Sequence, residues 1–389
     1  MTHSPHAVEL IGLAWDHTRG YVPLVAAAQR FGELHPDVTI AWRKRSLKAF
    51  GDQPLLDLAQ HFDLLVIDHP FIGYAAAHGM ILPLDEYLPS AFLADQEDQS
   101  VGASYASYHW EGRQWALAID AAAPVSAWRP DLLQRTGVRP PETWDDLIEL
   151  ARRRVVALPA VAIDSLMHFY MMCIALGETP FTTIGRVVDR QAGIAALEHL
   201  RALVALCDPA CLQRNPIQTY EALAVGDTLA YCPFAYGYSN YARSGYAANR
   251  LRFGGLATFD SQRLRSTLGG AGLAVSAACR HVDIAVAFAR FVADPAVQCG
   301  IYVASGGQPG YRAAWEDDLA NTICDGYFRD TLPTLDAAFL RPRYAGYTWF
   351  QDHAAPLVRA CLTGERSATA VMDDLDRLYH DSLVSGKGA

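Results

Sequence analysis

Residues 8–42 read VELIGLAWDHTRGYVPLVAAAQRFGELHPDVTIAW, and the pattern in this segment indicates the fold class. Val8–Ala14 is a short apolar run, which is typical of a buried strand. Pro23–Leu34 repeats apolar residues at helical spacing, and Val38–Trp42 is strand-like again. The segment therefore predicts a strand, a helix and a second strand in succession.

The same alternation continues downstream. A second helix is expected around Leu55–Ala59, and Phe62–Ile67 is an apolar run typical of a strand buried on both faces. A βαβαβ unit of this kind forms a parallel sheet, and ligands bind beyond the carboxyl ends of its strands. Trp15-Asp16-His17 and Asp68-His69-Pro70 occupy two of those ends.

Later segments keep this α/β character. Leu273–Ser276 is strand-like, and Val282–Ala293 has helical spacing and ends at Asp294-Pro295. The expected inner face of that helix is Ile284, Ala287, Phe288 and Phe291. A final helix begins after Ser367, a candidate N-cap, and its expected core stripe is Val371, Met372, Leu375, Leu378 and Tyr379.

Length and composition restrict the class of protein. A chain of 389 residues, 51% hydrophobic and 19% charged, suits two globular units. Its net charge of -10 disfavours nucleic acid and anionic lipid as partners, and we expect Arg43–Arg45 and Arg152–Arg154 to be solvated patches. Val155–Leu176 is apolar, but Pro159 and Asp164 interrupt it, so we expect a buried core segment and no membrane insertion.

The cysteines and the N-terminus add two expectations. Eight cysteines without CxxC pairs predict buried free thiols and no metal site, although Cys207 and Cys211 are close enough in sequence to form a disulfide if the loop geometry allows it. Residues 1–6 lack the basic and apolar regions of a signal peptide. We expect the chain as given to act in the cytoplasm, or outside it if a signal peptide has been removed.

Four segments resemble family 1 extracellular solute-binding proteins, the group that includes maltose-binding protein and many sugar and polyol receptors. The first comprises Phe31-Gly-Glu-Leu-His-Pro-Asp-Val38, Asp63-Leu-Leu-Val-Ile67 and Gly79-Met-Ile-Leu-Pro-Leu-Asp85. The second comprises 107–118, 128–133 and 141–147, where Thr143 and Asp146 have the spacing of a helix capping box. The third comprises 269–276 and 305–309, and the fourth is Arg341-Pro-Arg-Tyr344.

This resemblance implies a type II periplasmic-binding-protein-like fold: two α/β lobes, each a mostly parallel sheet flanked by helices, with hinge strands between them. It places one lobe at 1–119 plus 269–312 and the other at 120–268 plus 313–389. The ligand is expected in the cleft between the lobes, which close around it by hinge motion. The resemblance also implies capture of a small polar solute, with carbohydrate or polyol favoured, and an ABC permease as partner if the protein is exported.

The candidate ligand-binding residues combine aromatic surface with polar groups that fix orientation. Tyr231–Tyr238 is unusually aromatic, and Asp164 and His168 fall on one side of a helix. Core packing, capping by Asp68 and a hinge role for glycine are the competing explanations. The candidates are Trp15, Asp16, His17, Arg19, Asp68, His69, Asp120, Asp164, His168, Tyr236, Tyr238, Gly270, Arg312 and Tyr344, with Arg341 and Arg343 as further possible anion clamps.

An enzyme is the alternative class. The acid and base groups at 16–17, 68–69, 164 and 168 would serve an isomerase or lyase if they converged, and a cytosolic sensor is equally open. No GxSxG, HExxH or Walker motif is present. We therefore expect a monomeric binding protein without catalytic residues, metal or cofactor.

Overall fold

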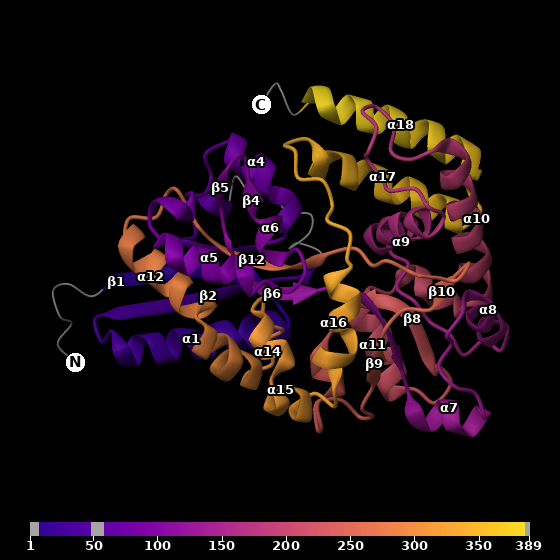
Figure 1. Ribbon diagram of the computed structural model, residues 1–389, viewed down its shortest axis with the longest axis horizontal. Helices are drawn as coiled ribbons and strands as arrows, with labels where there is room; N and C mark the ends of the chain where they lie inside the picture. The colour runs from indigo at the N-terminus through magenta and orange to yellow at the C-terminus, as the bar shows by residue number, and fades with distance from the viewer. Residues whose placement is uncertain (1–7, 48–57, 386–389) are drawn as a thin grey trace. The chain divides into compact units, whose positions relative to one another are not determined.

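The computed structural model describes residues 8–47 and 58–385 (Figure 1). The chain divides into two compact units, and each is described by itself. Unit 1 comprises Met1–Ala122, Leu268–Thr322 and Arg343–Ala345, and unit 2 comprises Ala123–Thr267, Ile323–Pro342 and Gly346–Ala389. The lobe boundaries expected from the sequence stay a prediction; they differ from these units mainly at 313–322 and 343–345.

A five-stranded sheet in the order β2-β1-β3-β12-β6 forms the centre of unit 1. Its strands are β1 (Val8–Trp15), β2 (Val38–Arg45), β3 (Leu64–Ile67), β6 (Leu117–Ala122) and β12 (Gly269–Val275). β1 pairs in parallel with both β2 and β3, which confirms the parallel sheet predicted for the N-terminal segment. β12 is antiparallel to β3 and to β6, so β6 runs in the same direction as β3.

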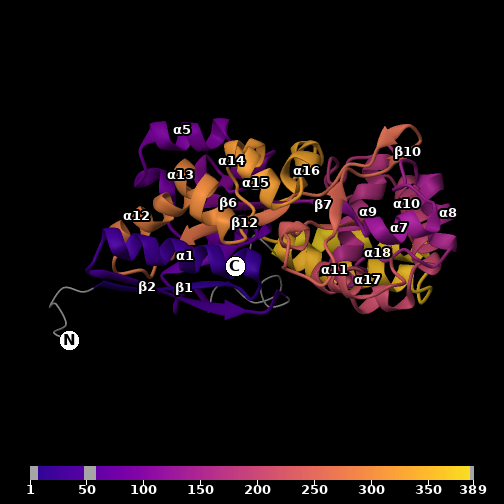
Figure 2. The same ribbon diagram turned by 90° about the horizontal axis from the view of Figure 1, so that it is seen from below.

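Helices cover both faces of this sheet. On one face, α1 (Thr18–Leu34) and α12 (Val282–Ala293) bury Leu24, Phe31 and Phe288 in a common core cluster with Leu10. Figure 2 shows α1 and α12 on the same side of β1 and β2. On the other face, α4 (Ile72–Ala77) packs against Leu65 and Ile67. The sheet is therefore covered on both sides, as its apolar strands require.

The rest of unit 1 consists of short elements. They are α5 (Ser90–Asp98), α6 (Ser104–Ser107), β4 (His109–Trp110), β5 (Arg113–Gln114), α13 (Pro295–Val297), the π-helical turn Gln298–Tyr302, α14 (Arg312–Glu316), α15 (Asp318–Ile323) and the 3-10 turns His69–Phe71 and Leu84–Glu86. α15 runs one residue past the unit boundary.

Two local predictions for unit 1 are wrong in detail. α1 begins at Thr18 and not at Pro23, because His17 caps the helix by accepting a hydrogen bond from the Arg19 backbone amide. In α12, Ala287 is exposed, and the buried face is instead centred on Ala285, Phe288, Ala289 and Val292. Asp283 and Arg290 lie four and three residues from Ala287 and so share its solvent-facing side.

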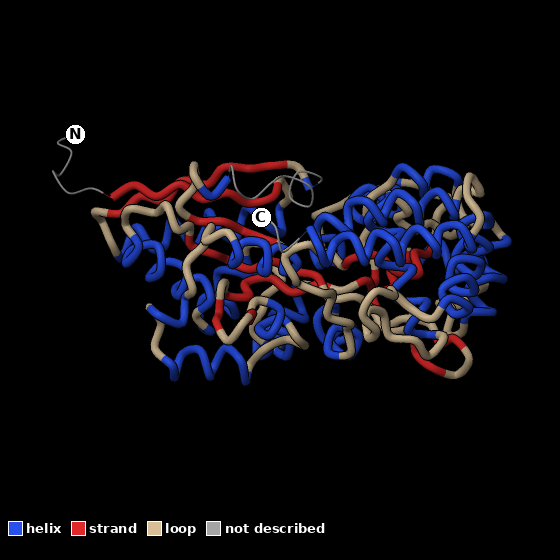
Figure 3. The backbone as a smooth tube through the Cα atoms, turned by 90° about the horizontal axis from the view of Figure 1, so that it is seen from above, coloured by secondary structure: helices blue, strands red, loops and turns tan. Residues whose placement is uncertain are grey.

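Unit 2 has a smaller sheet in the order β8-β7-β9, with helices packed around it. The strands are β7 (Pro124–Trp128), β8 (Tyr231–Tyr236) and β9 (Arg252–Gly254), with the hairpin β10 (Thr258–Phe259) and β11 (Gln262–Arg263). The helices are α7 (Pro130–Thr136), α8 (Trp144–Arg152), α9 (Ala162–Ala175), α10 (Arg190–Leu206), α11 (Pro216–Val225), α16 (Tyr327–Asp336), α17 (Tyr347–Leu362) and α18 (Ala368–Ser385). Figure 3 shows that helix outweighs strand in this unit.

Several sequence signals in unit 2 are confirmed. Thr143 and Asp146 form the predicted capping box at the start of α8. The Ser367 hydroxyl accepts a hydrogen bond from the Ala370 amide at 3.2 Å, which caps α18 as predicted. The predicted α18 stripe is buried at Val371, Met372, Leu375 and Tyr379, with Leu378 half-buried.

Two further predictions concern the cysteines and the apolar segments. All eight cysteines lie in the described ranges as free thiols, so Cys207 and Cys211 do not form a disulfide. Within the described ranges, no single helix is long and apolar enough to cross a membrane; the bent pair Val282–Ala293 with Pro295–Tyr302 passes on length and composition. The predicted helix around Leu55–Ala59 falls partly outside the described residues.

Candidate functional site

In unit 1 the predicted site residues gather at one edge of the sheet. β1, β3 and β6 run in the same direction, so their carboxyl ends meet there. Trp15 ends β1 and residues 16–19 follow it, residues 68–69 follow β3, and Asp120 lies near the end of β6. The topology thus brings together groups that are about a hundred residues apart in the chain.

Arg19 and Asp120 pair with each other at this edge. The Arg19 Nε donates to Asp120 Oδ2 at 2.8 Å, and its Nη2 donates to Oδ1. Their side chains are 5% and 0% exposed. A bidentate guanidinium–carboxylate pair compensates both buried charges, so the two groups add no net charge to this edge of the sheet.

His17 supports this ion pair from the start of α1. Its Nδ1 accepts a hydrogen bond from the Arg19 backbone amide at 3.0 Å, which fixes the first turn of the helix. Burial, together with the positive charge of nearby Arg19, lowers the pKa of His17 to about 3. The imidazole is therefore neutral at physiological pH.

Trp15 and Asp16 have opposite environments. Trp15 is 3% exposed and belongs to the core of unit 1. Its ring packs so closely on Gly20 that a Cβ there would lie 2.2 Å from it. The Asp16 side chain is 55% exposed and forms an ion pair with Lys44 Nζ at 2.8 Å. Asp16 is thus the accessible member of this loop.

Asp68 and His69 form a capped turn. Asp68 Oδ1 accepts a hydrogen bond from the His69 amide at 2.9 Å and lies 3.2 Å from His69 Nδ1. His69 is 1% exposed and meets Tyr108 edge to face, with ring centroids 6.5 Å apart. Asp68 therefore caps the turn that follows it, which is the alternative explanation for this residue.

Two residues without a predicted role adjoin the Arg19–Asp120 pair. The Gln308 backbone amide donates to the Asp120 carboxylate, and the Gln308 side chain donates to the Ala121 carbonyl at 3.1 Å. Tyr302, on the π-helical turn, is fully buried, and its hydroxyl has no hydrogen-bond partner among the described residues. Burial and the nearby Asp120 charge raise the pKa of Tyr302. Gln308 lies in the Ser305–Pro309 motif, whereas no sequence signal pointed to Tyr302.

The other candidate residues in unit 1 contact backbone atoms of neighbouring segments. Gly270 has φ +112°, and a Cβ there would lie 2.3 Å from the Asp120 carbonyl oxygen, so close strand pairing explains this glycine. Arg312 Nε donates to the Ser100 carbonyl at 3.3 Å. Arg343 Nη1 donates to the His109 carbonyl at 2.7 Å, and Tyr344 beside it is half-buried. In unit 2, Arg341 Nη1 donates to Gln351 Oε1 at 3.0 Å.

Unit 2 has an edge of its own. Val156 and Tyr231 form a parallel bridge, and the Ala157 amide donates to the Tyr231 carbonyl at 3.0 Å. The segment before α9 therefore runs alongside β8 in the same direction, and the start of α9 and the end of β8 follow at the same side. Half-buried Tyr236 ends β8, and its hydroxyl lies 3.1 Å from Thr267 Oγ1.

Near this edge lie the two remaining polar candidates. Asp164, in the first turn of α9, is 4% exposed, and His168, one turn later, is 1% exposed. Burial raises the pKa of Asp164 to about 8 and lowers that of His168 to about 3. Tyr238 is 3% exposed and packs edge to face on Tyr220, with ring centroids 6.3 Å apart. Tyr238 thus contributes to the core.

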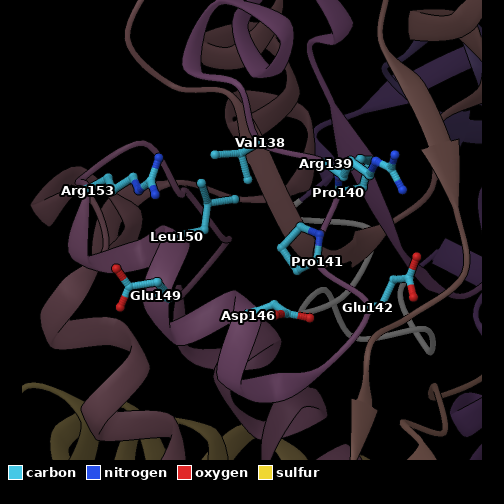
Figure 4. Close-up of a pocket in the computed structure, with 9 residues that line it drawn as sticks. All are labelled: Val138, Arg139, Pro140, Pro141, Glu142, Asp146, Glu149, Leu150 and Arg153. Carbon is cyan, nitrogen blue, oxygen red and sulfur yellow. The ribbon is translucent and has the colours of Figure 1, made fainter.

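A separate surface pocket of unit 2 contains none of the predicted site residues. It is lined by Val138, Arg139, Pro140, Pro141, Glu142, Asp146, Glu149, Leu150 and Arg153 (Figure 4). Asp146 is already engaged in the capping box of α8, and the other charges are of both signs. Among the described residues, no group of three or more His, Cys, Asp or Glu side chains is placed to hold a metal ion.

Two α/β units with interleaved segments, and a strand from the later part of the chain inserted in the N-terminal sheet, define a two-lobed periplasmic-binding-protein-like fold. Residues 14–182 match the family model of bacterial extracellular solute-binding proteins. The resemblance indicated by the sequence motifs is thus confirmed.

One curated protein resembles part of this chain in sequence, and solved structures resemble it in fold. The mannitol-binding protein of Pseudomonas aeruginosa is 28% identical over 150 residues, which are 37% of this chain and 34% of the relative, so the match spans about a third of that protein. A solute-binding protein of Agrobacterium radiobacter in complex with ribitol has a TM-score of 0.82 at 17% identity, covering 97% of this chain and 100% of the other. One from Thermotoga lettingae bound with α-D-tagatose has a TM-score of 0.83 at 16% identity, with the same coverage.

Proposed function

We propose that this protein is a solute-binding protein that captures a neutral polyol or sugar and releases it unchanged. The observation that carries the proposal is the sequence match to a mannitol-binding protein. Its fold is also that of receptors solved with ribitol and with α-D-tagatose. All three ligands are small, uncharged and rich in hydroxyl groups, which narrows the expected ligand class.

The chemistry of the two edges supports a neutral ligand. In unit 1 the buried charges of Arg19 and Asp120 neutralise each other, and His17 is uncharged at physiological pH. In unit 2 the edge offers the Tyr236 ring and the carboxyl of Asp164. Hydrogen-bonding groups with little net charge suit the hydroxyl groups of a polyol, and an aromatic ring suits its carbon-bound hydrogens. The position of the ligand in a cleft between lobes stays a prediction.

An enzymatic role receives less support. His17 is engaged in capping α1, and Asp68 with His69 forms a capped turn, so neither pair presents an acid and a base to a common substrate. Asp164 and His168 are buried on α9, and no hydrogen bond or ion pair joins them among the described residues. An isomerase or lyase needs such groups within hydrogen-bonding reach of one reacting atom.

A thermal-shift screen tests the proposal directly. D-mannitol, ribitol, D-tagatose and maltose are compared with glycine betaine and L-glutamate as charged controls. A ligand at about 100 times its dissociation constant adds roughly 2.7 kcal/mol to the free energy of unfolding. We expect a shift with at least one polyol or sugar and none with the charged compounds.

Mass spectrometry of the stabilising compound after incubation separates binding from catalysis. We expect the compound to be recovered unchanged, whereas conversion would establish the enzyme alternative. The same proposal includes delivery of the ligand to an ABC permease, the cellular compartment in which that delivery takes place, and a monomeric state of the protein. Light scattering on the purified chain tests the monomer, and a dimer at micromolar concentration would contradict it.

A further inference from the structure

Tyr302 carries a buried hydroxyl group that the ligand-free fold does not satisfy. The residue ends the π-helical turn Gln298–Tyr302 and is fully buried, and its hydroxyl has no hydrogen-bond partner among the described residues. Native folds seldom leave a buried polar group in this condition, because the group has lost its hydrogen bonds to water and has gained none in return. The position of this hydroxyl therefore calls for an explanation.

Close packing fixes the ring that carries the hydroxyl. A Cβ at Gly307 would lie 2.3 Å from the Tyr302 ring, so the loop after the π-helical turn lies directly against it. On another side, α1 packs against the turn, and Tyr302 shares a core cluster with Trp15 and Leu24. A ring held in this way keeps its hydroxyl at one point in unit 1.

This point is close to the Arg19–Asp120 ion pair. Burial and the negative charge of Asp120 raise the pKa of Tyr302, and the positive charge of Arg19 opposes them, so both charged groups act on the hydroxyl. Asp120 takes two hydrogen bonds from Arg19 and one from the Gln308 amide. In the ligand-free arrangement Asp120 thus relies on the guanidinium, and the Tyr302 hydroxyl is a nearby donor that takes no part.

Arg19 lies where a ligand would compete for it. It occupies the first turn of α1, at the carboxyl edge of the parallel strands, which is where ligands bind in sheets of this kind. Its N–H donors suit the hydroxyl oxygens of a polyol or sugar, but Asp120 engages them. Turning Arg19 to a ligand would leave Asp120 buried with an uncompensated charge, which is strongly unfavourable unless another donor replaces the guanidinium.

We propose that Tyr302 is the second hydrogen-bond donor of Asp120 and takes over this carboxylate when Arg19 turns to a bound polyol or sugar. Tyr302 is then a positioning residue, because it acts on the ligand only through Asp120 and Arg19. The inference rests on the proposed function and deepens it, since it states how an engaged arginine becomes available to a ligand.

The chemistry of a phenol suits this exchange. The raised pKa of Tyr302 keeps its hydroxyl protonated, so the hydroxyl can donate. A hydrogen bond from a hydroxyl to a carboxylate is charge-assisted and stronger than one between neutral groups. It therefore offsets part of what Asp120 loses with the guanidinium, while the remaining bond from the Gln308 amide stays in place.

The unfolding temperature of the ligand-free protein tests the exchange in a cycle of variants. Tyr302→Phe alone should unfold at or above the wild-type temperature, because it removes an unsatisfied hydroxyl. Arg19→Met removes both guanidinium hydrogen bonds, so Asp120 should then depend on Tyr302. In the Arg19→Met protein we therefore expect Tyr302→Phe to lower the unfolding temperature by about 2 °C or more. Arg19→Lys, which lacks the fork of donors, is the second background should Arg19→Met fail to fold.

Tyr311→Phe is the matched control. Tyr311 is also a buried tyrosine of unit 1, but its hydroxyl already donates to Asp95 Oδ2 at 3.2 Å. Its effect on the unfolding temperature should be the same with and without Arg19. A lower unfolding temperature for Tyr302→Phe alone would show that the hydroxyl serves the ligand-free fold, which overturns the inference. Equal effects of Tyr302→Phe in the wild-type and Arg19-variant backgrounds overturn it as well.

Calorimetry connects the exchange to binding, with whichever of D-mannitol, ribitol, D-tagatose and maltose stabilises the wild type most. Tyr302→Phe should weaken affinity on the order of tenfold, because Asp120 then lacks its second donor in the bound state. Tyr311→Phe should keep wild-type affinity, and wild-type affinity in Tyr302→Phe would overturn the inference alone. If the wild type binds none of the four compounds, the proposed function fails, and the stability cycle still decides whether Tyr302 is a donor to Asp120.

Discussion

Buried polar residues in this protein fall into two groups. Arg19 and Asp120 form two hydrogen bonds with each other, and His17 accepts a backbone hydrogen bond. Asp164 and His168 each carry an atom that has no hydrogen-bond partner in the described part of the chain. Because desolvation of a polar group is offset only when hydrogen bonds replace water, the first group is explained by the fold alone and the second is not.

The raised pKa of Asp164 predicts how stability changes with pH. The folded value is about 8 and the unfolded value about 3.9, so between these the folded state holds a proton that the unfolded state has lost. This contribution is fully present below pH 4 and is lost as pH rises to 8, at about 1.4 kcal/mol per pH unit. Asp164→Asn should therefore gain stability relative to wild type on going from pH 5 to pH 8, as measured by urea denaturation.

A non-titrating neighbour controls for general effects of pH. The Ser165 hydroxyl donates to the Ala160 carbonyl at 3.1 Å, and Ser165→Ala should cost about 1 kcal/mol at every pH. A stability difference between Asp164→Asn and wild type that stays constant across this range would show that Asp164 ionises at its ordinary pKa.

At the level of single residues, the sequence predicted polar positions better than it predicted their environments. The loop after β1 was identified, but Trp15 is in the core and Asp16 is at the surface. Adjacent residues after a strand point in different directions, and which direction faces solvent depends on elements that pack later. Tyr302 gave no signal, because a tyrosine in a helix is ordinary until its hydroxyl is found buried without a partner.

Strand β12 shows how one element constrains its neighbour. Gly270 pairs with Ala121 of β6, and the register shifts between Ala271 and Gly272. At φ +112° a Cβ would be strained and would lie 2.3 Å from the Asp120 carbonyl oxygen. Gly270→Ala should lower the free energy of unfolding by about 3 kcal/mol, as measured by urea denaturation.

Gly300 is the matched control for this prediction. It lies in the π-helical turn of the same unit, and a Cβ there would meet no atom within 4 Å. Gly300→Ala should change stability by less than about 0.5 kcal/mol. Equal effects of the two substitutions would contradict a special role of position 270.

Elements with strong local signals were predicted well. The Thr143 capping box and the α18 stripe appear where expected, because both depend on residues within one or two turns of each other. The inner face of α12 was wrong at Ala287, because that helix is apolar on most sides and periodicity alone does not select one stripe. The charged residues Asp283 and Arg290 mark the solvent-facing side of the helix and so identify its buried stripe.

At the level of the whole molecule, unit 1 is discontinuous in sequence. β12 comes from residues 269–275 and lies between β3 and β6 in the sheet. A fragment ending at residue 122 would lack this strand, which leaves β3 and β6 with open edges and β6 without its partner. We expect fragment 1–122 to be unfolded by circular dichroism and by amide proton dispersion in NMR.

Addition of the missing segment provides the complementary experiment. Coexpression of fragment 1–122 with fragment 268–322 supplies β12 and α12, and should recover structure that neither fragment has alone. A cooperative thermal transition in fragment 1–122 by itself would show that the sheet does not depend on the inserted strand.

Local patterns in the chain were enough to identify the alternating strands and helices, the family resemblance and the polar loops at the strand ends. Backbone preferences and capping act over a few residues, so they can be read directly from neighbouring positions. The partners of the buried polar groups came only from the folded arrangement. Arg19 and Asp120 are 101 residues apart, and the elements packed around α9 offer Asp164 Oδ2 no partner among the described residues. Desolvation and pairing depend on long-range packing, which no short stretch of sequence encodes by itself.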